Sequence, residues 1–340
     1  MMKTIEYGEI EGNYILVDVR SPGEFLEGTI NGAINIPLFD DEEREIIGTV
    51  YTRESIDKAK RIGLSVASKK LLHIYDEIKE LDKQYNKIII FCARGGMRSG
   101  ILGTLLSSLG VNTERINEGY KGYRRFVVEN LPKVNENVQY IVLHGNTGVG
   151  KTEILKQLQR DGFNILDLEG FANHRGSLLG TVGLGKSTSQ KAFESNIFHR
   201  LQESKGSYVF VEAESKRIGN ATIPDFIFQK MKTGIHIFVE ADILFRVDLI
   251  TREYTKFENC NEEIIECLKR LEKYIGAGNI DRYSKLVLNS QYDEVVSELM
   301  IKHYDPMYTH GSNKYAYELK VVVVDIKTAS EKIKNWMKTI

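Results

Sequence analysis

The feature that most restricts the fold of this chain is a phosphate-binding motif, Gly-x4-Gly-Lys-Thr, at residues 145–152. The apolar segment 139–143 before it is typical of a buried strand, and the segment 152–160 after it is typical of a helix. Glycines between a strand and a helix let backbone N–H groups turn toward phosphate oxygens at the positive end of the helix dipole. The sequence therefore predicts a parallel α/β domain that binds phosphate at the carboxyl end of this strand.

The residue types within this phosphate loop (residues 145–152) indicate the role of each one. Lys151 is expected to reach the terminal phosphates of a ligand, and the Thr152 hydroxyl is placed to ligate Mg²⁺. Glu212 and Glu214 follow a predicted strand, where a carboxylate partner for the metal belongs. The usual residue there is aspartate, and a solvated strand end is the alternative interpretation. The expected phosphate contacts are Gly145, Asn146, Thr147, Gly148, Val149, Gly150, Lys151 and Thr152.

The first 130 residues contain a separate strand and helix series. Apolar segments at 14–20, 33–36 and 87–91 predict buried strands. The charged segment 40–85 predicts helix, with its apolar residues near helical spacing, and 99–109 predicts another helix. Alternating strands and helices predict a second parallel sheet. The apolar residues near helical spacing are Leu64, Ala67, Leu71 and Leu72.

Cys92 directly follows the predicted strand 87–91, so it lies where open α/β sheets place their ligands. Backbone N–H groups, a helix N-terminus and two arginines can stabilise a thiolate at this position. A cysteine after an apolar strand is otherwise a small buried side chain, and the glycines and arginines here argue against that alternative. Cys260 and Cys267 have no such surroundings and are expected to pack. The loop residues after Cys92 are Arg94, Gly95, Gly96, Met97 and Arg98.

The two series suggest two domains, 1–133 and 138–340, joined by a polar, proline-containing linker at 131–137. After the phosphate loop, further strands are expected near 163–166, 208–211, 235–239 and 321–325. The Gly-, Ser- and Thr-rich segment 176–190 predicts a mobile loop, and 244–304 is mostly helical.

Composition limits the surroundings and the partners of the chain. The formal net charge of −1 gives no overall attraction to nucleic acid, so an RNA site must be a local patch such as 121–125 or 269–270, with solvated helix faces as the alternative. The apolar runs are too short to cross a bilayer, so no membrane partner is expected. An odd number of cysteines, three, and no apolar leader indicate a reducing, cytoplasmic setting.

The first 130 residues resemble a rhodanese domain, a family that carries sulfur or selenium on its loop cysteine. Cys92 and Arg98 are separated by five residues, whereas the simplest rhodanese loop has four. The longer spacing is similar to that of rhodanese-like dual-specificity phosphatases, but Phe91 replaces the histidine that precedes their cysteine. The matching segments are Asp18-Val-Arg20, Glu24-Phe25, 28–37, the Cys92 loop and 119–123.

A rhodanese domain followed by a P-loop NTPase-like α/β domain with a helical carboxyl-terminal part resembles the bacterial tRNA 2-selenouridine synthases over nearly the whole chain. The resemblance implies that selenium from selenophosphate replaces the sulfur of wobble 2-thiouridine in the tRNA anticodon loop. It also implies an S-geranyl intermediate made from geranyl diphosphate, and no tightly bound cofactor. Further blocks that match are 40–49, 167–177, 190–194, 211–215 and 304–308.

Within this resemblance, Cys92 receives selenium or positions its donor, with Arg94 and Arg98 binding an oxyanion, and Lys151 neutralises the diphosphate leaving group. His174 and Arg175 are expected to contact substrate or RNA phosphate, with local capping as the alternative. Helices after residue 244 would supply an isoprenoid pocket or simply pack. Two rival classes stay open, a rhodanese-fused ATPase or kinase and a Cys-x5-Arg phosphatase, and the oligomeric state is undetermined.

Overall fold

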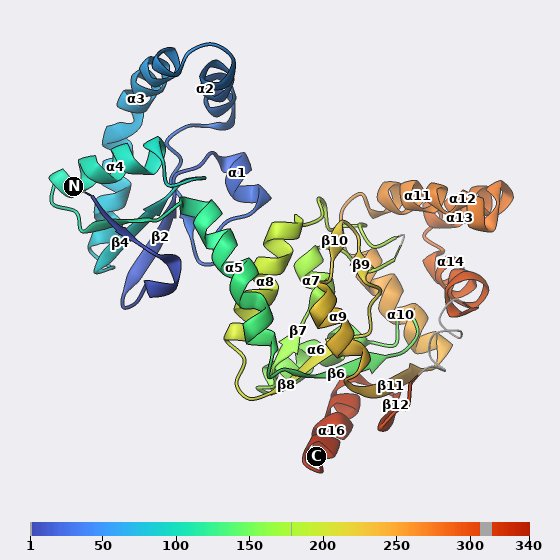
Figure 1. The fold of residues 1–340 in the computed structure, drawn as a ribbon. Coiled ribbons are helices and arrows are strands. Elements are labelled where there is room, and N and C mark those ends of the chain that lie inside the picture. The colour runs from blue at the N-terminus through green and yellow to red at the C-terminus, as the bar shows by residue number, and fades with distance from the viewer. Residues whose placement is uncertain (1, 178, 307–314) are drawn as a thin grey trace. The chain divides into compact units, whose positions relative to one another are not determined.

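The computed structural model describes residues 2–177, 179–306 and 315–340. The chain forms two compact units, Met1–Lys133 with Glu194–Phe198, and Val134–Phe193 with His199–Ile340. Each unit contains a parallel β-sheet flanked by helices, as predicted (Figure 1). None of the helices in the described ranges is both long and apolar enough to cross a membrane.

The sheet of the first unit has five parallel strands in the order β1-β5-β4-β2-β3. The central strand β4 is buried on both faces, and Ile88 to Phe91 are fully inaccessible. This double burial explains the unbroken apolar run, which is typical of parallel sheets. The strands are β1 Lys3–Ile5, β2 Tyr14–Asp18, β3 Ile34–Asn35, β4 Lys87–Phe91 and β5 Thr113–Ile116.

Two helices of the first unit, α2 and α3, begin after a residue whose side chain accepts a backbone hydrogen bond from the first turn. The Asp40 side chain accepts a hydrogen bond from the Glu43 backbone while Glu43 accepts one from the Asp40 backbone, which starts α2 with a capping box. The helices are α1 Pro22–Glu27, α2 Asp41–Arg53, α3 Ile56–Asp82, α4 Met97–Ser108 and α5 Gly119–Asn135, with a 3-10 turn η1 at Tyr7–Glu9.

Two features of this unit differ from the sequence prediction. On α3 the residues Leu64 and Leu72 are 64% and 73% exposed, because the helix turns a face of small residues, Gly63 among them, toward α2. The expected linker 131–137 is largely helical, since α5 continues to Asn135. Pro132 lies in the last turn of α5, where it removes the hydrogen bond that its own backbone nitrogen would otherwise donate.

The sheet of the second unit has five parallel strands in the order β12-β11-β6-β8-β7. Leu143 of β6 pairs with Glu212 of β8, so the phosphate loop and Glu212 leave the sheet side by side. The strands are β6 Gln139–His144, β7 Ile165–Leu166, β8 Tyr208–Glu212, β11 Ile235–Ala241 and β12 Leu319–Val323, and a short antiparallel ribbon joins β9 Arg217–Ile218 to β10 Ala221–Thr222.

Helices of the second unit surround the sheet and form a helical part near the carboxyl end (Figure 1). Cys267 is buried in the core of this helical part and Cys260 packs against it. Val182 is also fully buried there, so the segment 176–190, expected to be a mobile loop, is partly packed. The helices are α6 Lys151–Arg160, α7 Leu168–Ala172, α8 Gln190–Gln202, α9 Asp225–Lys232, α10 Ile243–Tyr254, α11 Cys260–Arg270, α12 Glu272–Ile275, α13 Ala277–Leu288, α14 Tyr292–Leu299, the π-helix η2 Met300–Tyr304 and α16 Ile326–Met337.

Candidate functional site

The first candidate site is the loop that begins at Cys92, directly after β4. The thiol is free and buried, and the Ser99 hydroxyl donates a hydrogen bond to its sulfur over 3.2 Å. Burial acts to raise the pKa of the Cys92 thiol, but hydrogen bonds from the Ser99 hydroxyl and from the Ser99 and Arg94 backbones, with the charge of Arg98, hold that pKa below its usual value. The loop is therefore built to stabilise a thiolate.

The amino-terminal end of α5 holds the cysteine loop in place. The backbone N–H of Tyr120 donates to the Cys92 carbonyl over 2.8 Å, and that of Lys121 donates to the Ala93 carbonyl over 3.0 Å. Gly119 has a φ of +57°, and a Cβ there would lie 2.1 Å from the Cys92 carbonyl oxygen. Only glycine permits this close approach, which explains why the rhodanese-like segment 119–123 begins with glycine.

The two loop arginines are in different situations. Arg94 is exposed, whereas the Arg98 guanidinium donates to both carboxylate oxygens of Glu24, over 2.5 and 3.2 Å. Burial acts to raise the pKa of Glu24, but the hydrogen bond and charge of Arg98 keep it below its usual value. An oxyanion at this loop would share Arg98 with Glu24, which was not predicted as a site residue.

Asp18 and Arg20 of the same unit have a structural role. They form a buried ion pair in which Arg20 also donates to the Gly28 carbonyl over 2.7 Å and stacks on Tyr120. The pair ties β2, the segment after α1 and the start of α5 together, which positions the cysteine loop.

The second candidate site is the phosphate loop between β6 and α6. The Lys151 ammonium donates to the carbonyls of Gly145, over 2.9 Å, and Asn146, over 3.3 Å, while Val149 packs into the sheet core. The buried Arg246 supports the loop from α10 by donating to the Thr147 carbonyl over 2.9 Å. Arg246 was not predicted as a site residue, because its contact lies 99 residues away in the chain.

Asp305 holds the other side of Arg246, with both carboxylate oxygens accepting from the guanidinium over 2.6 and 2.9 Å. This ion pair gives Asp305, in the matching segment 304–308, a structural role. Met307 and Tyr308 of that segment lie outside the described residues. A bidentate arginine–carboxylate pair holds its geometry firmly, so it fixes the phosphate loop against α10.

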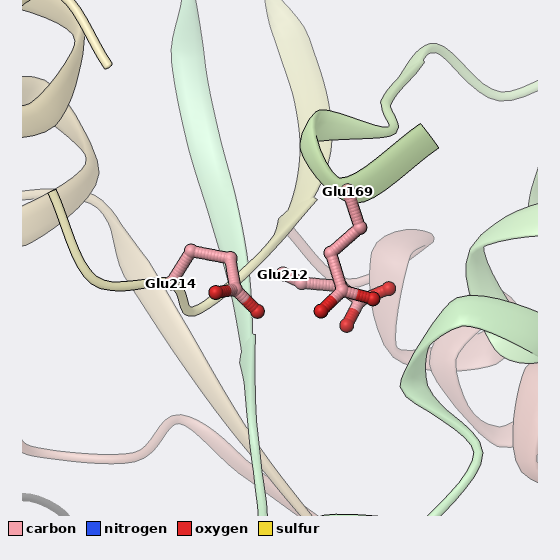
Figure 2. Close-up of side chains that lie close together, drawn as sticks. All are labelled: Glu169, Glu212 and Glu214. Atoms are coloured by element: carbon pink, nitrogen blue, oxygen red, sulfur yellow. The ribbon is translucent and has the colours of Figure 1, made fainter. Parts of the chain in front are cut away.

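Three glutamates converge beside the phosphate loop (Figure 2). Glu169 comes from α7, Glu212 ends β8 and Glu214 follows two residues later, and one oxygen of each lies within 4.8 Å of the others. Glu169 was not predicted as a site residue, although it lies in the matching segment 167–177.

Burial is the main cause that raises the pKa of all three carboxyls above the usual value. For Glu169 and Glu214 the charge of Glu212 adds to this effect, while Lys151 opposes it in every case. A hydrogen bond between Glu212 and the Thr152 side chain also acts to lower the pKa of Glu212. The structure thus joins Thr152, Glu212 and Glu214, the residues expected near a metal.

His174 and Arg175 line the same cleft, and both side chains already have partners within this unit. Arg175 donates to Glu253 over 2.7 Å and to the Val182 carbonyl over 2.6 Å, and it stacks on Tyr254. His174 accepts the Gly176 N–H over 3.1 Å, and burial with the charge of Arg175 lowers its pKa. Both residues line the cleft that contains Lys151, and their contact with substrate or RNA phosphate stays a prediction.

Two cavities meet at the phosphate loop. The first is a polar cleft of about 260 Å³, lined by Lys151, Thr152 and the three glutamates. The second is an apolar cavity of about 60 Å³ inside the helical part. Residues that line both are Thr147, Ser177, Ile250 and Tyr254. The apolar residues that line only the second cavity include Ile264, Leu268, Val287, Val295, Leu299 and Met300.

Comparison with known proteins gives matches over both units. Residues 138–340 match the tRNA 2-selenouridine synthase AAA domain, and residues 7–126 match the rhodanese-like domain. The tRNA 2-selenouridine synthase of Hydrogenovibrio crunogenus is 30% identical over 89% of this chain and 90% of its own length. The enzyme of the same name from Sulfurovum sp. is 30% identical over 89% of this chain and 90% of its own length. The one from Nitrosomonas eutropha is 34% identical over 70% of this chain and 62% of its own length.

Proposed function

The chain belongs to the tRNA 2-selenouridine synthase family, and on that premise we propose that it replaces the sulfur of wobble 2-thiouridine in tRNA with selenium. In this proposal geranyl diphosphate first alkylates the sulfur, and selenium from selenophosphate then displaces the geranylated sulfur. The protein is thus a transferase of two groups, geranyl and selenium. No tightly bound organic cofactor takes part.

The observation that carries the proposal is the meeting of a phosphate cleft and an apolar cavity at shared walls. A ligand that occupies both must have a phosphate head and an apolar tail. ATP would place a ribose and a polar base beyond its phosphates, and these groups need hydrogen-bonding partners that apolar walls cannot supply. The arrangement therefore supports an allylic diphosphate over a nucleotide.

The size of the apolar cavity supports the same ligand. A water molecule needs about 10–15 Å³ of such space, so the 60 Å³ cavity accommodates roughly four to six non-hydrogen atoms. One isoprene unit has five carbons. The distal isoprene unit of a geranyl group would fill the cavity, and the proximal unit would lie between the shared walls beside the phosphate loop.

The phosphate loop would serve the first step by stabilising the leaving group. The thiouridine sulfur attacks the first carbon of the geranyl chain, the carbon–oxygen bond breaks, and the diphosphate departs with the bonding pair while the base loses its N3 proton. Lys151, at the start of α6, and the loop N–H groups would stabilise the negative charge that develops on this leaving group. Lys151 would exchange its contacts with the Gly145 and Asn146 carbonyls for the diphosphate.

Cys92 would serve the second step, in which the selenium of selenophosphate attacks the ring carbon and geranylthiol leaves with the bonding pair and a proton. Alkylation makes this departure feasible because a thiol is a better leaving group than a thiocarbonyl sulfur. Water then takes the phosphoryl group, which breaks the selenium–phosphorus bond and releases phosphate. The thiolate held by Ser99 and the loop backbone is suited to positioning the selenium donor, a role that needs no change of oxidation state. Arg94 and Arg98 would bind the phosphate of selenophosphate.

The tRNA substrate requires a local basic surface because the chain is nearly neutral overall. In the segment 121–125, Lys121 is exposed and Arg125 pairs with Glu118 near the surface. In the segment 269–270, Arg270 pairs with Glu266. RNA phosphates would compete with these exposed carboxylates, whose ion pairs contribute little stability.

The proposal is tested by incubating the purified protein with thiolated tRNA and geranyl diphosphate, then digesting the tRNA and weighing its nucleosides. S-geranyl-2-thiouridine is expected, and adding selenophosphate should convert it to 2-selenouridine. ATP turnover without any dependence on an allylic diphosphate would favour the kinase or ATPase alternative. Hydrolysis of an aryl phosphate that Cys92→Ser abolishes would favour the phosphatase.

A further inference from the structure

We propose that Glu169, Glu212 and Glu214 form a site that binds one divalent cation of the Mg²⁺ or Mn²⁺ class before any phosphate ligand arrives. The inference rests on the proposed function only for the identity of the diphosphate that the bound cation would later contact. It differs from binding of a metal–phosphate complex, because here the protein itself supplies enough ligands to retain the ion.

The geometry brings three carboxylates to one point from three backbone positions. One oxygen of each glutamate lies within 4.8 Å of the others, and Figure 2 shows the carboxylates turned toward one another. Glu212 and Glu214 are held by the end of β8, and Glu169 approaches from the first turn of α7. An ion between them would reach all three with small side-chain movements.

A buried carboxylate oxygen without a partner points to a missing positive charge. Glu212 is 5% exposed, and its Oε1 atom has no hydrogen-bond partner among the described residues. Lys151 acts electrostatically on all three glutamates, but its ammonium donates to the Gly145 and Asn146 carbonyls. Buried carboxylates are normally paired or bound to metal, so a cation would satisfy this oxygen.

The ligand set selects the class of cation. All the available atoms are oxygens, which hard ions such as Mg²⁺ and Mn²⁺ prefer. The Thr152 side chain bonds to Glu212 and would add a fourth oxygen. An octahedral ion would then have positions left for water or for diphosphate oxygens from the cleft.

Gly176 leaves the space beside the glutamates open. A Cβ at this position would lie 2.7 Å from a Glu169 oxygen and 2.9 Å from a Glu214 oxygen. The residue also has a φ of +64°, which favours glycine. Any larger side chain would push the carboxylates out of the arrangement that an ion requires.

The test measures Mn²⁺ binding to the full-length protein without tRNA, geranyl diphosphate or selenophosphate, by the loss of the free Mn²⁺ signal in electron paramagnetic resonance. We expect one ion per chain and a rise in Tm when the ion is added. Glu169→Gln should weaken binding by at least roughly tenfold, because it removes a direct ligand and even groups that only support the ligands are worth about 10-fold to 100-fold in affinity. The matched control is Glu240→Gln, at an exposed glutamate of β11 outside the cleft.

A second readout separates ligand loss from misfolding. Without metal, Glu169→Gln removes one of several crowded carboxylates, so its Tm in EDTA should equal or exceed that of the wild type, and its rise with Mn²⁺ should be smaller. Glu214→Gln should behave in the same way. These two results together require a folded variant.

Mn²⁺ binding that appears only with inorganic diphosphate, or binding that Glu169→Gln leaves unchanged, would overturn the proposal. Because none of these measurements uses an allylic donor or tRNA, their failure would leave the geranylation assay to decide the proposed function separately. Conversely, a protein that binds Mn²⁺ alone but forms no geranylated tRNA would retain the metal site and lose the proposed reaction.

Discussion

Filling the apolar cavity should change the length of the donor that the protein accepts. Val287 lies on α13, is 1% exposed and lines the cavity. Val287→Phe adds four carbons, which would occupy most of a space that holds roughly four to six non-hydrogen atoms. The variant should therefore exclude the distal isoprene unit of geranyl diphosphate while leaving the phosphate cleft unchanged.

The magnitude follows from the apolar surface that the donor can no longer bury. At about 0.8 kcal/mol per CH₂, excluding five carbons costs about 4 kcal/mol, or about a thousandfold in kcat/KM for geranyl diphosphate. Dimethylallyl diphosphate has only the proximal unit, so its kcat/KM should change little. Extra volume in a packed core also costs about 1–3 kcal/mol of stability, which a Tm measurement would detect.

The assay compares the rates of tRNA alkylation with the two donors, for wild type, Val287→Phe and a control. The control is Leu288→Phe, which places the same residue type on the same helix at a position that is 65% exposed. A Val287→Phe protein that used both donors at wild-type rates would refute the assignment of the tail to this cavity. Equal losses with both donors would indicate damage to the phosphate cleft instead.

Lys151→Ala should sharply reduce geranyl transfer, because it removes the side-chain cation of the phosphate loop. If the variant alkylated thiolated tRNA at the wild-type rate, Lys151 would not stabilise the leaving group. Cys92→Ala should block selenium incorporation and accumulate S-geranyl-2-thiouridine, which mass spectrometry of the nucleosides would reveal. Because the pKa of Cys92 is held below its usual value, its alkylation by iodoacetamide should reach a plateau at a lower pH than that of an ordinary thiol. Ser99→Ala should move that profile to higher pH by removing a hydrogen bond to the thiolate. Arg98→Lys should impair selenium transfer although it keeps the charge, since a lysine ammonium cannot bind Glu24 and an oxyanion together as the planar guanidinium does. A fully active lysine variant would show that Arg98 has only a structural role.

Sequence alone was sufficient for the features that depend on neighbouring residues. The phosphate loop 145–152 and the Cys92 loop are contiguous, and each joins a strand to a helix, so residue order predicts their position at the sheet edge. The two parallel α/β units followed from the same alternation of strands and helices.

Only the tertiary structure decided which distant residues complete these loops. Glu24 meets Arg98 across 74 residues, and Arg246 meets the Thr147 carbonyl across 99. Glu169 joins Glu212 because α7 follows β7, the strand that pairs with β8. No local pattern encodes these meetings, because strand register and helix packing are set by the burial of whole faces. The same global burial carried α5 through Pro132 and turned Leu64 and Leu72 toward solvent, where local propensity alone had suggested otherwise.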